Sequence, residues 1–199
     1  LYTKAVLEKK LKIKFLKKIV LVTYHSETLK KKSSESNLKN LFNALKTMED
    51  TTVIFTMPNS DIESMVVYNL ISKFISNRKN YYLFKSLGQK KYYSCCKYSN
   101  FMIGNSSSGL LEMPTFKKFT INIGERQSGR IKAKSIIDCN AKTKNIIKAI
   151  KFSFESVNQK KIKTIINPYG TGGASKKIIN ILRQKNLNNL IIKEFFNIQ

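Results

Sequence analysis

The chain has 199 residues, of which 42% are hydrophobic, so it can bury the core of one sizeable domain and lacks the composition of a disordered segment. Its formal net charge is +25, yet only four of its 37 Lys and Arg residues are arginines, and the lysines are spread along the whole chain. Nucleic-acid readers favour arginine, whose planar guanidinium pairs with phosphate and guanine. We therefore expect a solvated basic surface and no nucleic-acid partner, with nucleic-acid binding kept as the weaker alternative.

Short apolar runs alternate with helical periodicity along the chain. The runs that predict buried strands are β-branched or aromatic and bounded by turn residues: 18–24, 51–57, 80–84, 100–104, 119–124 and 134–138. The stretches with apolar residues at helical spacing are 33–48, 60–77, 89–99, 108–113, 143–154 and 174–184. Strands that alternate with helices predict a mostly parallel sheet covered on both faces. The expected fold class is therefore α/β and Rossmann-like.

The cysteines and apolar runs limit the kinds of site and compartment. Cys95, Cys96 and Cys139 fit neither a disulfide framework nor a zinc site, because adjacent thiols cannot chelate as C-x-x-C does and the chain has one histidine. No stretch reaches the roughly 18 apolar residues of a membrane span, and the N-terminus lacks the apolar core of a signal peptide. We expect a cytoplasmic protein with no metal, no cofactor and no membrane partner.

His25 is the first candidate site residue, because it directly follows the predicted strand 18–24. Parallel sheets bind ligands outside the carboxyl ends of their strands. A neutral imidazole can act as an acid or a base near neutral pH. The alternative is a histidine that is merely hydrogen-bonded in a strand-end turn, and the residues alone leave both interpretations open.

The turn after the predicted strand 100–104 is the second candidate. It contains Asn105, Ser106, Ser107, Ser108 and Gly109 and leads into a predicted helix start. Backbone amides and serine hydroxyls at such a start can hold an anion, and glycine lets the backbone approach a phosphate closely. A simple capped helix start has the same composition, so this alternative also stays open.

Charged residues make this second candidate more specific. Glu112 lies one helical turn beyond Ser108, where its carboxylate can accept ribose hydroxyls or close a capping box. Arg126 and Arg130, half of all the arginines, follow the predicted strand 119–124. A bidentate phosphate clamp requires the guanidinium geometry that lysine lacks. Together these residues predict a nucleoside diphosphate held between two strand-end loops.

Five segments, taken in order, resemble motifs of the hydrolysing UDP-N-acetylglucosamine 2-epimerases, which make N-acetylmannosamine for sialic-acid-type sugars. These segments are VTYHSET, FTMPNSD, SLGQKKYYS, GNSSSGLLEMP with TINIGERQSGR, and NPYGTGGASKKI. The resemblance covers nearly the whole chain and is to the C-terminal half of the family's two-domain GT-B architecture. It implies a linking helix at 1–17 from a missing N-terminal domain, a Rossmann-like UDP-binding domain at 18–185 and a tail at 186–199.

The resemblance also implies roles for individual residues. Ser106 and Ser107 would bind the diphosphate, Glu112 the ribose hydroxyls and Arg126 the phosphates. His25 matches the family's histidine in the catalytic cleft. The further candidates, which carry less weight, are Asn59 and Gly88 near the cleft or the uracil, together with Gly109 and Arg130.

The implied reaction converts UDP-N-acetylglucosamine to N-acetylmannosamine and UDP by removal of the C2 proton, elimination of UDP and addition of water. The family's proton-abstracting carboxylates belong to the N-terminal domain. We therefore expect this chain alone to be inactive, with a UDP-sugar and the N-terminal domain as partners, and a homo-oligomer when the protein is full length. The alternatives are a UDP-N,N'-diacetylbacillosamine 2-epimerase and a non-catalytic UDP-sugar-binding fragment.

Overall fold

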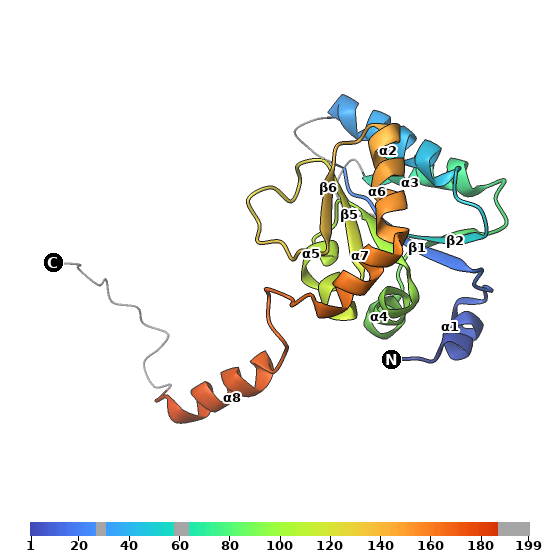
Figure 1. The fold of residues 1–199 in the computed structure, drawn as a ribbon. Helices are drawn as coiled ribbons and strands as arrows, with labels where there is room; N and C mark the ends of the chain where they lie inside the picture. The colour runs from blue at the N-terminus through green and yellow to red at the C-terminus, as the bar shows by residue number, and fades with distance from the viewer. Residues whose placement is uncertain (27–30, 58–63, 187–199) are drawn as a thin grey trace. The chain divides into compact units, whose positions relative to one another are not determined.

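The computed structural model describes residues 1–26, 31–57 and 64–186 (Figure 1). The chain divides into two compact units, Leu1–Tyr169 and Gly170–Gln199. The first unit contains the sheet and all the candidate site residues that the structure describes. The described part of the second unit is built around helix α8, Ala174–Gln184, which the periodicity of the sequence predicts.

A six-stranded sheet forms the centre of the first unit, with the order β3-β2-β1-β4-β5-β6 and every pair of neighbours parallel. Its strands are β1 Lys18–Thr23, β2 Thr51–Thr56, β3 Tyr81–Phe84, β4 Phe101–Gly104, β5 Phe119–Ile123 and β6 Ile136–Cys139. This strand order is that of a doubly wound Rossmann sheet. The predicted Rossmann-like fold is confirmed, and the sheet is entirely parallel.

Helices cover both faces of the sheet, as predicted, because successive strand residues point to opposite sides. In β1, Val20 and Val22 join one core cluster while Ile19 and Leu21 join the other. The first cluster packs against α2 Lys31–Leu45, α3 Ser64–Ile75 and α6 Thr143–Phe154. The second packs against α1 Lys4–Leu11 and α4 Gly88–Tyr98. Helices thus bury both faces of the central strands β1, β2, β4 and β5, which explains the continuous apolar runs there.

Several short helices refine the sequence-based expectation. The predicted helix over 108–113 is two elements, α5 Ser108–Leu111 and the 3₁₀ helix η1 Met113–Phe116, which has Pro114 in its first turn. Because proline lacks an N–H and fixes φ, it fits the start of the second element better than the interior of a longer helix. The remaining short helices are α7 Ser156–Lys161 and η2 Ile162–Thr164.

Two observations on the described residues concern membranes and metal ions. None of the helices in these parts of the chain combines the length and the apolar character needed to cross a membrane. No group of three or more His, Cys, Asp or Glu residues there is arranged to hold a metal ion.

Candidate functional site

The candidate residues gather at the carboxyl edge of the sheet where β1 and β4 lie side by side. From β1 the sheet continues through β2 and β3, and from β4 it continues in the opposite direction through β5 and β6. In parallel α/β sheets, the loops that leave such a pair of strands diverge and open a crevice that binds ligands. His25 follows β1, the serine turn follows β4, and Arg126 follows β5.

Asn105 joins these three loops. Its side chain is fully buried and pairs with the backbone of His25: Oδ1 accepts the His25 N–H at 2.7 Å, and Nδ2 donates to the His25 carbonyl at 2.9 Å. The Asn105 carbonyl accepts Nη1 of Arg126 at 3.2 Å and Nε2 of the buried Gln127 at 2.7 Å. One residue therefore fixes the histidine loop, the serine turn and the arginine loop relative to one another.

The serine turn presents three half-buried residues, Ser106, Ser107 and Ser108. The Ser106 hydroxyl accepts the Ser108 N–H at 3.3 Å, and Ser107 is the N-cap of α5 without a side-chain capping bond. Hydroxyls and amides gathered in one turn can bind a phosphate oxygen. Since α5 is only four residues long, this capacity comes from the turn itself and not from a long helix dipole.

The buried Gly109 has a packing role in this structure. A Cβ at this position would lie 2.4 Å from Cγ2 of Thr120, and the Thr120 hydroxyl donates to the Gly109 carbonyl at 2.8 Å. The absence of a side chain thus lets α5 lie close against β5. This contact accounts for the glycine without a ligand, and a role in phosphate approach stays a prediction.

Glu112 makes a side-chain contact that differs from a capping box. The hydroxyl of Ser108 donates to Oε2 of Glu112, and the hydroxyl of Tyr92, from α4, is hydrogen-bonded to that of Ser108. A capping box would require the Glu112 side chain to accept the N–H of the N-cap residue, which here is Ser107. The contact of Glu112 with Ser108 is therefore not a capping box, and through Ser108 it links Glu112 to Tyr92.

The Tyr92 hydroxyl stays protonated at neutral pH. Burial raises its pKa well above the usual value, and the nearby Cys96 and Glu112 raise it further, while hydrogen bonds with Ser108 and Thr23 oppose the shift. A protonated phenol carries one hydrogen that it can donate. Tyr92 is therefore available as a hydrogen-bond donor within the site.

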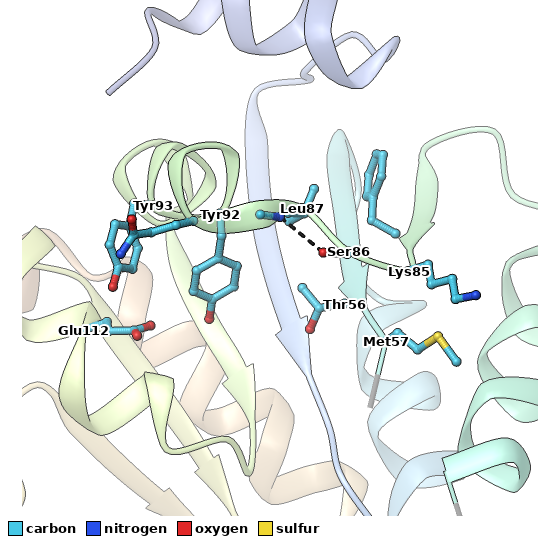
Figure 2. A pocket seen from close by; sticks show the side chains of 11 residues that line it. Thr56, Met57, Lys85, Ser86, Leu87, Tyr92, Tyr93 and Glu112 are labelled. Atoms are coloured by element: carbon cyan, nitrogen blue, oxygen red, sulfur yellow. Dashed lines mark hydrogen bonds between the residues drawn. The ribbon is translucent and has the colours of Figure 1, made fainter. Parts of the chain in front are cut away.

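A cavity of about 300 Å³ opens beside Glu112 (Figure 2). Tyr92, Tyr93 and Glu112 line it at one end and Thr56 and Met57, from the end of β2, at the other. The remaining lining residues are Phe84, Lys85, Ser86, Leu87, Gly88 and Gln89. Aromatic and apolar walls with one carboxylate suit a small ring system that carries hydroxyl groups, such as a nucleoside.

Gly88 lies in the wall of this cavity, at the first residue of α4. Its φ of +62° is in the left-handed region, which glycine adopts without steric cost. Nothing lies within 4 Å of where a Cβ would be, so the conformation and not crowding explains this glycine. Gly88 and Glu112 therefore share one cavity, as a common ligand would require.

The other predicted residues lie as follows. Arg126 is exposed, and its Nη1 donates to the Asn105 carbonyl. Arg130 is also exposed. His25 is 6% exposed and does not line the cavity beside Glu112. Asn59 lies outside the described residues.

Two residues to which sequence reasoning gave no role, Asn105 and Tyr92, hold the parts of the site together. Asn105 directly follows a strand, and polar residues at strand ends are a recognisable signal, but His25, the partner of its side chain, is 80 residues away in the chain. Tyr92 is part of an ordinary helical pattern. Nothing in its spacing indicates that its hydroxyl reaches Ser108.

Several known proteins are similar to this chain over most of its length. A family model described as UDP-N-acetylglucosamine 2-epimerase matches residues 1–183. A "GDP/UDP-N,N'-diacetylbacillosamine 2-epimerase (hydrolyzing)" of Campylobacter jejuni is 36% identical over 96% of this chain and 50% of its own length. "Polysialic acid biosynthesis protein P7" of Escherichia coli is 34% identical over 90% of this chain and 44% of its own. The chain thus spans about half the length of these relatives.

Solved structures support the fold. A structure described as an S. aureus MnaA–UDP co-structure superposes with a TM-score of 0.68 at 19% identity, covering 92% of this chain and 48% of the other. Coverage of about half of that protein fits the predicted place of this chain as one half, the C-terminal one, of a GT-B architecture.

Proposed function

Because the chain belongs to the UDP-N-acetylglucosamine 2-epimerase family, we propose that it is the UDP-binding half of a hydrolysing UDP-sugar 2-epimerase. The observation that carries the proposal is the joining of the serine turn, the arginine loop and the Glu112 cavity at one edge of the sheet. Each of the three suits a different part of a nucleoside diphosphate: hydroxyls and amides for phosphate oxygens, a guanidinium for phosphate charge, and a carboxylate for ribose hydroxyls.

In this proposal the half-site stabilises the leaving group. Removal of the sugar C2 proton and departure of UDP leave a glycal-type intermediate, to which water adds with inverted configuration at C2. Negative charge develops on the β-phosphate as the C1–oxygen bond breaks. Ser106, Ser107 and Arg126 would offset that charge, and fixed donors of this kind stabilise a transition state without reorganisation. His25 would act in the cleft, and the C2 base would come from the other half of the protein.

The sugar substrate has two candidates, and the names of relatives support both of them. The E. coli relative is named for polysialic acid biosynthesis, which favours UDP-N-acetylglucosamine and its conversion to N-acetylmannosamine. The C. jejuni relative is named for N,N'-diacetylbacillosamine, which favours that sugar. We place UDP-N-acetylglucosamine first. Both candidates share the nucleotide, so the proposed roles of Ser106, Glu112 and Arg126 are the same in either case.

Calorimetric titration with UDP, UMP and ADP, at two salt concentrations, tests the proposal. We expect UDP to bind more tightly than UMP, because only UDP has a second phosphate for Arg126, and more tightly than ADP, because the cavity recognises the base. A few directed contacts should change little with salt. Binding to duplex DNA would instead fall steeply, with a slope near −0.9 per contacted phosphate. No preference for UDP would contradict the proposal.

Arg126→Ala is expected to weaken UDP binding by about tenfold to a hundredfold, the usual cost of losing hydrogen bonds from a charged group. His25→Ala should leave the dissociation constant nearly unchanged, because we assign this residue to turnover. Arg78→Ala is the matched control: it removes the same charge, but Arg78 stacks on Phe74, with its guanidinium carbon 4.6 Å from the ring centroid. Equal losses for Arg126→Ala and Arg78→Ala would show that general basicity, and not a directed contact, attracts the nucleotide.

A further inference from the structure

The hydrogen bonds around Glu112 have a fixed direction. A carboxylate only accepts, so the single hydrogen of the Ser108 hydroxyl is donated to Oε2 of Glu112. Ser108 is then an acceptor toward its other partner, and the Tyr92 hydroxyl must donate to it. The three groups form an ordered chain of donors that ends on the carboxylate.

The Tyr92 side chain is also held from the side of the sheet. It packs against the second core cluster, which contains Ile19 and Leu21 of β1. Tyr92 is therefore fixed by packing against the sheet on one side while its hydroxyl holds Ser108 on the other.

This arrangement restricts a side chain that would otherwise be mobile. A glutamate loses rotamer freedom when a ligand orders it, and that loss weakens binding. Here Oε2 is already engaged with Ser108, so the carboxylate is ordered in advance and Oε1 is left to accept from a ligand. The Tyr92 ring also lines the cavity beside Glu112 (Figure 2), so the residue that orders the carboxylate faces the same space.

We propose that Tyr92 is a positioning residue that acts through Ser108 to preset the Glu112 carboxylate for the hydroxyls of a nucleotide ribose. The inference rests on the proposed function, because it takes Glu112 as the ribose acceptor. It goes further in assigning ribose recognition to a hydroxyl that does not itself touch the ligand.

The test compares UDP with 2'-deoxy-UDP, each titrated calorimetrically into the full chain and its variants. The unmodified protein should prefer UDP, and Glu112→Gln should abolish that preference. Tyr92→Phe should weaken UDP binding by about threefold to tenfold, the cost of one hydrogen bond, and leave 2'-deoxy-UDP nearly unchanged. Tyr98→Phe is the matched control, because its hydroxyl donates to the Tyr2 carbonyl at 3.1 Å, at the last residue of the same helix. This control should keep the full preference.

The outcomes separate the two proposals. Absence of UDP binding, or a preference that Glu112→Gln leaves intact, would overturn the proposed nucleotide site. If Glu112→Gln abolishes the preference but Tyr92→Phe retains it, or weakens both nucleotides equally, the positioning role alone is wrong. A readout without ligand completes the test: the NMR shift of the Glu112 carboxyl carbon should move in Tyr92→Phe and stay in place in Tyr98→Phe. An unmoved shift in Tyr92→Phe would also overturn the inference.

Discussion

Replacing Asn105 with alanine is expected to lower the free energy of unfolding by about 2–5 kcal/mol and to weaken UDP binding in the protein that remains folded. The substitution removes two hydrogen bonds, at 2.7 and 2.9 Å, to the backbone of His25, which is itself buried. A buried backbone group that loses its partner costs about 1–3 kcal/mol. The loss also separates the histidine loop from the serine turn, so the effect should exceed that of a simple packing defect.

Asn100→Ala is the matched control for this prediction. Asn100 also joins β4 to β1, since its Oδ1 accepts the Ile19 N–H at 2.8 Å, but it does so at the amino end of the strands. Urea unfolding should show a smaller loss, about 1–2 kcal/mol, and UDP affinity should not change. Asn105→Asp keeps the hydrogen-bond acceptor and loses the donor. Its loss of unfolding free energy should lie between those of Asn105→Ala and Asn100→Ala. An Asn105→Ala loss no larger than that of Asn100→Ala would contradict the bridging role.

The arrangement of the sheet could be predicted from the sequence because its four central strands, β1, β2, β4 and β5, are buried on both faces. The run VIFT in β2 does not alternate with polar residues, and stretches with helical periodicity lie on either side of it. This combination is typical of a parallel sheet that helices cover on both faces. The short elements could not be predicted in the same way. Six residues in α7 and three in η2 give too few repeats for a period to be recognised, and the helix predicted over 108–113 does not separate α5 from η1.

The residues of the candidate site could be named from the sequence, but their connections could not. Serines, glutamate and arginine after strand ends suit a phosphate and a ribose, and their roles as ligands stay a prediction. The bonds that order them depend on which loops lie side by side. Tyr92 and Ser108 come from α4 and the start of α5, and Asn105 and His25 follow β4 and β1, so their pairing requires the three-dimensional order of the strands. The positions of the strands along the sequence, without their order in the sheet, do not show which residues pair.

Gly104→Ala is expected to have the largest effect on stability, a loss on the order of 3–5 kcal/mol from backbone strain and overpacking together. Gly104 has a φ of +142°, and a Cβ there would lie 2.0 Å from the carbonyl oxygen of Thr23 in the neighbouring strand. Gly129→Ala is the matched control, because its φ is +74° but nothing lies within 4 Å of its Cβ position. That control should cost only the conformational term, about 1–2 kcal/mol.

The difference between these two glycines follows from where each lies. Gly104 ends β4 opposite Thr23, directly before Asn105, so any shift that relieves the clash moves the residue that holds His25. A domain is stable by only about 5–15 kcal/mol, so a loss of this size should lower the urea midpoint strongly or leave the protein unfolded. Circular dichroism measures the urea midpoints of both variants. Equal midpoints for Gly104→Ala and Gly129→Ala would show that β1 and β4 can move apart without a cost in free energy of unfolding. The close contact of the two strands would then not be what fixes the histidine loop against the serine turn.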